Sequence, residues 1–234
     1  MESILEFKNI TYYYKSGDRK ISILEDASYL FEKGKLYTII GASGSGKTTT
    51  LTIAGALEAQ KSGEVLFENK DLREIGYTNY RNRKIGIVFQ SYNLLNYLNP
   101  CQNIIAAMEI TKNAIENKKQ RAEELLFRMG LTKEQIHRNI NKLSGGEQQR
   151  VAIARALSTN ADIILADEPT GNLDADTAKE IITIFKELAH KDGKCVIAVT
   201  HSRDFARMAD VVIKLENKKL ITKAVASNSN GGTV

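Results

Sequence analysis

The sequence has few cysteines and no long apolar run. Its two cysteines, Cys101 and Cys195, are far apart and do not form a metal-type pair, so we expect free thiols in a reducing cytoplasm. No stretch approaches the roughly 20 apolar residues that a membrane-spanning helix needs. Residues 1–10 (MESILEFKNI) alternate apolar and polar side chains, unlike a secretory signal. If the protein works at a membrane, we expect another chain to span it.

Basic residues only slightly outnumber acidic residues. The 33 basic and 28 acidic residues give a formal net charge of +5. Such a charge permits contact with nucleic acid or an anionic membrane but does not require it. The chain has 234 residues, which is enough for one large domain with a subdomain. We find no internal repeat.

Short apolar runs alternate with helical patterns along most of the chain. The expected strands are 4–7, 21–24, 36–40, 63–67, 85–89, 163–166 and 195–199, and the expected helices are 48–57, 104–115, 122–129 and 177–189. A nearly all-apolar run such as Leu36–Ile40 is typical of a strand buried on both faces of a parallel sheet. The alternation predicts an α/β fold with a mostly parallel sheet.

Residues 98–159 differ from the rest of the chain, because their apolar residues recur mainly at helical spacing. We expect a single domain over residues 1–226, with a core formed by about residues 1–97 and 160–226. Residues 98–159 are then an inserted α-helical subdomain. Residues 227–234 (SNSNGGTV) are small and polar, so we expect a disordered tail.

Residues 41–48 (GASGSGKT) directly follow the expected strand Leu36–Ile40 and match the phosphate-loop pattern G-x-x-x-x-G-K-[S/T]. The backbone N–H groups from Gly44 to Lys47 can turn toward a polyanion, and larger side chains would block that approach. Lys47 would contact the β- and γ-phosphates, and the Thr48 hydroxyl would bind Mg²⁺. The alternative is a Gly/Ser linker, but a linker has no reason to follow a buried strand and open a helix with Lys-Thr.

Two carboxylates, Asp167 and Glu168, end the apolar run that begins at Ile163. Open α/β sheets bind ligands at the carboxyl ends of their strands. One carboxylate can hold a hydrated Mg²⁺ ion and the other can polarise an attacking water. The alternative is a strand that simply ends in solvated acids.

A third segment, Leu143–Arg150 (LSGGEQQR), opens the helical sequence VAIARAL. Ser144 is a good N-cap, and Glu147 three residues later completes a capping box. That pattern alone is structural. The adjacent Gly145 and Gly146, however, leave bare N–H groups at the positive end of the helix, which suggests a second anion site.

Together these segments resemble the nucleotide-binding subunit of an ATP-binding cassette (ABC) transporter over about residues 3–222. The matching segments are Gly41–Thr48, Gln90, Leu143–Arg150, Ile163–Glu168, Gly171–Asp174 and His201. The resemblance implies a P-loop ATPase fold with a mostly parallel core sheet, an antiparallel β part near the N-terminus and an inserted helical subdomain. It implies Mg²⁺-dependent hydrolysis of ATP by two copies paired head-to-tail, with two ATP molecules at their interface.

The resemblance also implies roles for single residues. Glu168 corresponds to the general base, and His201 to the switch residue on the γ-phosphate. Gln90 corresponds to the residue that contacts Mg²⁺ and water and senses the γ-phosphate. Further nucleotide contacts are implied for Gly41, Ser43, Thr49 and, across the dimer interface, for Ser144, Gly145, Gly146, Glu147 and Asp174.

An aromatic residue that stacks on adenine is also implied. Tyr14 resembles it, although Tyr12 and Tyr13 leave the choice open and a core aromatic is the alternative. His137 and His190 lie on polar helical stretches and are expected to be surface residues. Alanine at position 42 stands where many members have proline, and Ser202 follows the histidine where aspartate is common. Neither departure removes a group that the chemistry uses, so we expect an active ATPase.

The segments VFQSYNLL and LADEPTGNLD resemble the lipoprotein-release, macrolide- and peptide-exporter branch, which works with a separate permease. Residues 91–100 (SYNLLNYLNP) are apolar for a loop and could form the groove for a permease helix, although several of them could instead pack the helical subdomain. We expect a peripheral protein on the cytoplasmic face of the cell membrane, and no nucleic-acid partner. The cargo stays open among peptides, lipoproteins, drug-like molecules and signal transmission.

The rival function is a soluble ATPase with the same head, acting in DNA repair or translation. The DNA-repair type carries a long coiled coil or a zinc module between the glutamine and the LSGGE segment. Here the interval from Gln90 to Leu143 has only short helical patterns and no cysteine cluster. The translation type has two cassettes in one chain, whereas this chain has one.

Overall fold

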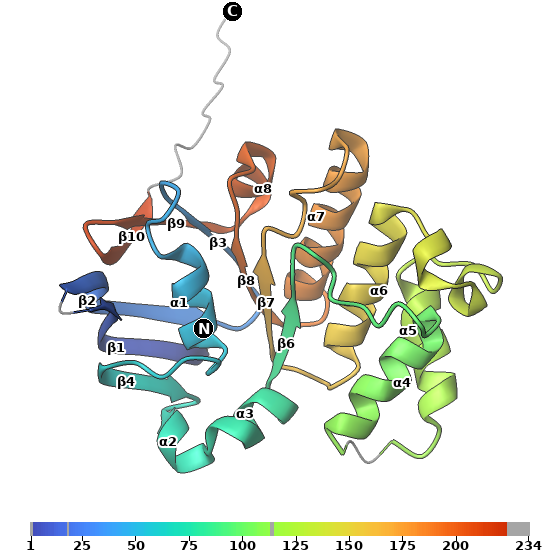
Figure 1. The fold of residues 1–234 in the computed structure, drawn as a ribbon, viewed down its shortest axis with the longest axis horizontal. Coiled ribbons are helices and arrows are strands. Elements are labelled where there is room, and N and C mark those ends of the chain that lie inside the picture. Colours follow the sequence, from blue (N-terminus) through green and yellow to red (C-terminus); the bar gives the residue numbers. More distant parts are fainter. Residues whose placement is uncertain (1, 18, 113–114, 224–234) are drawn as a thin grey trace, which may run out of the picture.

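The computed structural model describes residues 2–17, 19–112 and 115–223, which form two sheets flanked by helices (Figure 1). An antiparallel sheet has the order β2-β1-β4-β5, with β1 (Ser3–Ser16), β2 (Arg19–Glu32), β4 (Ser62–Phe67) and β5 (Lys70–Asp71). A second sheet has the order β10-β9-β3-β8-β7-β6, with β3 (Leu36–Ile40), β6 (Ile85–Val88), β7 (Ile163–Asp167), β8 (Cys195–Val199), β9 (Val211–Glu216) and β10 (Lys219–Lys223). It is parallel from β9 to β6, and β10 pairs antiparallel with β9. The predicted α/β fold with a mostly parallel sheet and an antiparallel β part is confirmed.

The helices of the described residues are α1 (Lys47–Ala54), α2 (Leu72–Ile75), α3 (Tyr77–Arg83), α4 (Pro100–Ile110), α5 (Lys118–Arg128), α6 (Gly145–Leu157), α7 (Ala175–His190) and α8 (Arg203–Met208). Two 3₁₀ turns, Gln135–His137 and Ile140–Lys142, precede α6. In Figure 1, α4, α5 and α6 lie together on the side of the parallel sheet that is away from the antiparallel sheet. Over the described part of the chain, none of the helices combines the length and the apolar character that crossing a bilayer takes.

The parallel sheet is buried on both faces, and successive residues of its strands join different cores. In β7, Ile164 and Ala166 belong to a core with α4 to α7, whereas Ile163 and Leu165 belong to a core with α1 and the antiparallel sheet. Because side chains alternate across a strand, an apolar run without polar interruptions is what such a two-sided strand needs.

Several elements differ from their predicted bounds. The strands expected at 4–7 and 21–24 are parts of the long strands β1 and β2. The helix expected from residue 104 begins at Pro100, because Asn99 and Gln102 form a capping box there. It ends at Ile110, before Lys112, whose φ of 50° is not helical. The elements α2, α3, α8, β5, β9 and β10 were not predicted, and residues 227–234 lie outside the described residues.

The parallel strands end at one edge of the sheet, and the predicted site residues follow them. Gly41 comes after β3, Gln90 after β6, and His201 after β8, while Asp167 is the last residue of β7. Such an edge is where open α/β sheets bind ligands.

Candidate nucleotide-binding site

The loop Gly41–Thr48 connects β3 to α1 and can be built only with glycine at its last turn. Gly46 is the N-cap of α1 with φ 101°, in the left-handed region. A Cβ at that position would also lie 2.1 Å from Ile23 Cγ2 of β2. Strand β2 therefore packs directly against the loop backbone at position 46. A side chain at this position would force β2 away from the start of α1.

The loop encloses one positive charge and one buried hydroxyl. Lys47 is 6% exposed, and its Nζ donates to Gly41 O at 3.1 Å and to Ala42 O at 3.0 Å. Ser45 Oγ is buried and makes no hydrogen bond within the described residues. An ammonium, an unpaired hydroxyl and the free N–H groups at the start of a helix are the donor set that a phosphate group requires.

Thr48 brings the loop to the end of β7. Its Oγ1 donates to Asp167 Oδ1 at 3.3 Å. Burial raises the pKa of Asp167, and the hydrogen bond from Thr48 acts in the opposite direction. A hydroxyl and a carboxylate side by side next to a phosphate-binding loop form the kind of oxygen donor set that Mg²⁺ prefers.

Glu168 and His201 contact each other at the ends of neighbouring strands. Glu168 directly follows β7, and His201 lies two residues after the end of β8. His201 N donates to Glu168 Oε2 at 3.2 Å, and His201 Nε2 lies 3.4 Å from Glu168 Oε1. Glu168 has a left-handed φ of 45°, and its backbone N donates to Val199 O at 2.9 Å. Non-glycine residues in this conformation carry strain that is frequently found at functional sites.

Gln90 lies beside the turn that follows Glu168. The carbonyl of Gln90 accepts a hydrogen bond from Asn172 Nδ2 at 3.3 Å. A Cβ at Gly171 would lie 3.0 Å from Gln90 Nε2, and Gly171 N donates back to Glu168 O at 3.0 Å. The side-chain amide of Gln90 is thus packed against the backbone of this turn.

The three neighbouring tyrosines differ in what covers their rings. Tyr12 is buried and hydrogen-bonds Glu58. The Tyr13 ring is covered by Lys20 Nζ, 4.9 Å from its centroid. Tyr14 is 41% exposed, and its hydroxyl lies 3.1 Å from Thr49 Oγ1 on α1. Of the three, Tyr14 combines an exposed ring with a contact to the helix that the phosphate loop opens.

Ser144 begins α6 with the predicted capping box. Glu147 N donates to Ser144 Oγ at 3.3 Å, and Ser144 N donates to Glu147 Oε2 at 2.7 Å. Asp174 is the N-cap of α7, and its side chain accepts hydrogen bonds from Asp176 N and Thr177 N. The Thr177 hydroxyl and these N–H groups hold the pKa of Asp174 below its usual value. Ser144 and Asp174 are both exposed at helix starts.

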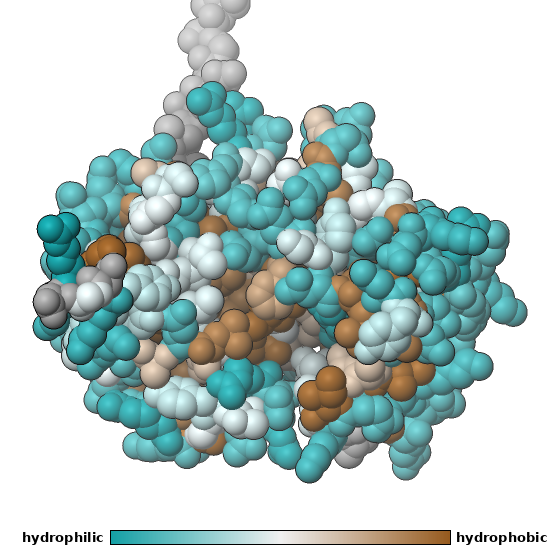
Figure 2. Space-filling view, viewed as in Figure 1, coloured by the Kyte–Doolittle hydropathy of each residue, from teal (hydrophilic) through white to brown (hydrophobic). Residues whose placement is uncertain are grey.

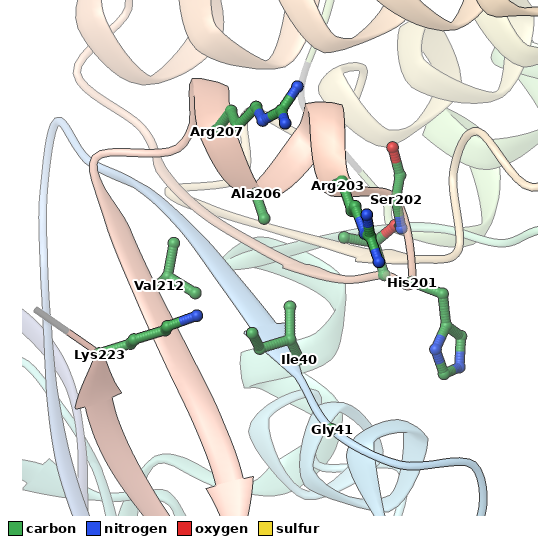
Figure 3. A pocket seen from close by; sticks show the side chains of 10 residues that line it. Ile40, Gly41, His201, Ser202, Arg203, Ala206, Arg207, Val212 and Lys223 are labelled. Carbon is green, nitrogen blue, oxygen red and sulfur yellow. The ribbon is translucent and has the colours of Figure 1, made fainter. Parts of the chain in front are cut away.

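A pocket of about 590 Å³ adjoins the loop at Gly41 but lies beside the phosphate-binding groups rather than on them. Ile40, Ala206 and Val212 line it, with Arg203, Arg207 and Lys223 around them, and Figure 3 shows the His201 imidazole pointing away from Ala206 and Val212. His201 lines this pocket as well, and together with Glu168 it also lines a cavity of about 370 Å³ beside the start of α7.

The predicted site residues fall into two groups. The residues near the Gly41–Thr48 loop form the first group. Ser43, Lys47, Thr49, Gln90, Asp167, Glu168 and His201 lie at or near the carboxyl edge of the parallel sheet, and Tyr14 reaches Thr49 from β1 of the antiparallel sheet. The segment Ser144–Glu147 starts α6, which Figure 1 draws well apart from α1. The sequence analysis assigned no role of their own to Asn172, within the Gly171–Asp174 segment, or to Arg155. Asn172 contacts Gln90 and Arg155 contacts the loop after it, and both contacts depend on the fold. Both cysteines are free and buried, and burial raises the pKa of both thiols.

Known proteins share this sequence and fold. A sequence model of the family "ABC transporter" matches residues 24–171. An uncharacterized ABC transporter ATP-binding protein of Bacillus subtilis, YclH, is 46% identical over 94% of this chain and 97% of its own length. The macrolide export ATP-binding/permease protein MacB of Bartonella henselae is 37% identical over 96% of this chain, which spans only 34% of that protein.

Solved structures agree with the sequence relatives. A dimeric ABC transporter cassette, MJ0796 of Methanocaldococcus jannaschii, matches with a TM-score of 0.84 and 37% identity over 93% of this chain and 96% of that one. A dimeric post-hydrolysis state of the same cassette, bound to ADP and Pi, matches equally well. The chain therefore belongs to the ABC transporter family, as an ATP-binding cassette.

Proposed function

We propose that this chain is the ATP-hydrolysing subunit of a membrane transporter, and that two copies bind two ATP molecules between them to drive a permease. One observation carries the proposal. The chain has two backbone segments suited to phosphate, Gly41–Thr48 and Ser144–Gly146, and they lie on separate parts of the molecule (Figure 1). We infer from this separation that a triphosphate held by one segment meets the other segment of a second copy. The dimeric cassettes that this chain resembles support that arrangement.

The residues at the sheet edge fit ATP and Mg²⁺. The Ser45 hydroxyl, which has no hydrogen-bond partner among the described residues, and the enclosed Lys47 ammonium suit the phosphates, and Tyr14 on the neighbouring β1 suits the adenine ring. Thr48 and Asp167 are the residues that would hold the metal. By the family pattern, Gln90 would contact it as well. A bound Mg²⁺ would neutralise phosphate charge. We also propose that residues 98–159 form an α-helical subdomain inserted into the ATP-binding core.

Hydrolysis needs a water molecule held in line with the terminal phosphate. Glu168 is the group proposed to orient that water and accept its proton, because its carboxylate is fixed by two contacts from His201. Lys47 and the loop N–H groups bind the phosphates and offset the charge that develops on them. From the second copy, Ser144 and the N–H groups of Gly145 and Gly146 complete the enclosure.

The proposed contact with the permease is the loop between β6 and α4. Tyr97 is 79% exposed and Leu95 is 38% exposed, whereas Tyr92 and Leu94 pack against the core of α4 to α7. Figure 2 shows apolar side chains gathered over α4 and beside this loop, within a largely hydrophilic surface. The buried Asn103 amide holds the loop through Leu95 N and O, at 2.8 and 3.2 Å. A rigid loop with exposed apolar side chains suits an apolar helix of a membrane subunit.

The likeness to MacB proteins supports a place in an export or extraction system for a peptide, lipoprotein or drug-like cargo. The proposed location is the cytoplasmic face of the cell membrane, through a separate permease. The family match and the transporter relatives favour this function over a soluble ATPase of DNA repair or translation.

Mixing two inactive variants tests the composite site. Lys47→Ala disables the phosphate loop, and Ser144→Arg blocks the segment at the start of α6, so each variant alone should lose ATPase activity. A mixed dimer contains one site with both changes and one site with neither. An equal mixture should therefore regain about a quarter of the wild-type activity, because half of randomly paired dimers are mixed. The control is Lys47→Ala mixed with the double variant, which has no intact site. Failure of the first mixture to exceed the control contradicts the proposal.

A further inference from the structure

The loop that follows Gln90 has an unusual backbone. Tyr92 and Asn93 are consecutive non-glycine residues in the left-handed region, with φ values of 58° and 51°. For a bulky residue such as tyrosine this conformation is uncommon and costs energy, so the surroundings must hold it in place. What holds this turn also fixes the position of Gln90.

The side chain of Arg155, on α6, donates hydrogen bonds to this turn. Its Nη2 donates to Tyr92 O at 2.8 Å, and its Nη1 donates to Asn93 O. In the part of the chain that the structure describes, Arg155 forms no ion pair with a carboxylate, so its charge acts on these two carbonyl groups. Burial lowers the pKa of Arg155, although an arginine remains charged at any working pH. Hydrogen bonds from a charged fork to two adjacent carbonyls are strong and directional.

The same turn contacts the first residue of α6. A Cβ at Gly145 would lie 2.9 Å from the Tyr92 hydroxyl, so the tyrosine ring reaches the helix start next to Ser144. Asn172 Nδ2 donates to Gln90 O at 3.3 Å and ties the loop to the segment before α7. The loop therefore has two attachments to α6 and one to the Gly171–Asp174 segment.

We propose that Arg155 is a positioning residue for ATP hydrolysis: by holding the Tyr92 and Asn93 carbonyls, it sets the place of the Gln90 amide and links that amide to the helix that starts at Ser144. The inference rests on the proposed role of Gln90 at the γ-phosphate. It adds that the group sensing a protomer's own nucleotide and the segment closing on the partner's nucleotide move as one body.

Arg155→Lys tests this role while keeping the positive charge. A lysine ammonium has no planar fork and cannot hold both carbonyls in the same geometry. The expected result is a kcat about ten-fold lower with a KM for ATP within about two-fold, because the Gly41–Thr48 loop and Tyr14 are untouched. Arg155→Gln, which keeps one N–H donor group without the charge, is the second variant if the first unfolds below the assay temperature.

Arg81→Lys is the matched control. Arg81 Nη1 donates at 2.6 Å to the carbonyl of Ala56, which is also left-handed, with a φ of 52°. This contact lies at the far end of α1 from the phosphate loop. The control should show a similar change in melting temperature but a kcat within about two-fold of wild type. A ten-fold loss in the control as well would mean that loss of any such contact slows the enzyme, and it would overturn the proposal.

A double-variant cycle separates positioning from a general structural effect. If Arg155 acts through Gln90, then Arg155→Lys in a Gln90→Ala background should lower kcat less than about two-fold. An undiminished ten-fold loss in that background, or wild-type kcat in Arg155→Lys alone, refutes the role of Arg155 and leaves that of Gln90 standing. A wild-type kcat for Gln90→Ala refutes the proposed role of Gln90 itself, and the inference falls with it.

A spectroscopic measurement reports on the loop without turnover. The chain contains no tryptophan, so a tryptophan in place of the exposed Ser91 is a single probe next to the turn. Its fluorescence anisotropy should fall in the Arg155→Lys variant and not in the Arg81→Lys variant. Equal anisotropy in all three backgrounds contradicts the claim that Arg155 orders the loop.

Discussion

The imidazole Nε2 of His201 lies 3.4 Å from Glu168 Oε1, while the backbone N–H of His201 donates to the other carboxylate oxygen at 3.2 Å. The two residues follow neighbouring parallel strands, whose register pairs Asp167 with Val199. Contacts on both oxygens hold the carboxylate in one orientation, as a group that must direct a water molecule requires. This pair makes Glu168 the first position to test.

Glu168→Gln should bind ATP but hydrolyse it at least about 100-fold more slowly, because the amide keeps the shape of the side chain and lacks its basicity. The enclosure formed by both copies stays intact, so ATP-bound dimers should accumulate. Size-exclusion chromatography with ATP and a steady-state phosphate assay measure the two effects.

The matched control is Glu187→Gln near the end of α7, where Glu187 pairs with Lys191 on the surface. This variant should keep wild-type turnover and should not accumulate as a dimer. Only monomer in the Glu168→Gln sample, or unchanged turnover, would contradict the assignment of Glu168.

Tyr14→Ala should raise the KM for ATP about five- to ten-fold with little change in kcat, because stacking on the adenine ring contributes about 1 kcal/mol to binding. Tyr13→Ala is the control, because the Tyr13 ring is already covered by Lys20. Initial rates over a range of ATP concentrations measure both variants. If Tyr13→Ala has the larger effect, the adenine ring is bound by the other tyrosine.

Gly46→Ala should lower the free energy of unfolding by about 2–3 kcal/mol and abolish ATP binding, since the added methyl meets Ile23 Cγ2 and φ is 101°. Gly193→Ala is the control. It has a left-handed φ of 65° but no atom within 4 Å of the new Cβ, so it should cost about 1 kcal/mol and leave ATP binding intact. Urea unfolding and nucleotide titration give the two quantities.

A second substitution checks the cause of the Gly46→Ala effect. Ile23→Ala removes the methyl group that a Cβ at position 46 would meet, so adding it to Gly46→Ala should recover part of the lost ATP binding. If the double variant binds no better than Gly46→Ala alone, the contact with β2 is not what requires glycine in this loop.

The parts of the fold that could be predicted have a local signal. The strand Leu36–Ile40 and the loop after it were predicted within a residue, because a nearly all-apolar run followed by a glycine-rich phosphate-loop pattern is a strong local signal. The capping box at Ser144 was likewise predicted, because it depends on residues three positions apart. The candidate residues around Asp167 could be placed because parallel strands end at one edge.

The rest depends on contacts between segments distant in the sequence. Strand β1 runs for 14 residues because it pairs with both β2 and β4, and its own pattern indicated only a short part. Arg155 reads as one more polar residue of α6, and only the fold shows that it meets carbonyls 62 and 63 residues earlier. The same holds for Tyr14, which is distinguished from its neighbours by exposure and by its contact with Thr49.

Tyr97→Asp should detach the chain from the proposed permease without impairing its ATPase chemistry. The Tyr97 side chain is 79% exposed in a loop whose backbone Asn103 holds, so the change alters the surface and not the fold. A carboxylate there would have to be buried without a partner against an apolar helix, which costs several kcal/mol. The fraction of the chain in washed membranes should fall about ten-fold or more, while the ATPase activity of the purified chain should remain within two-fold.

Ile221→Asp is the control, because Ile221 is also exposed but lies on β10, away from this loop. Equal loss from membranes in both variants would mean that added negative charge, and not the β6–α4 loop, governs attachment.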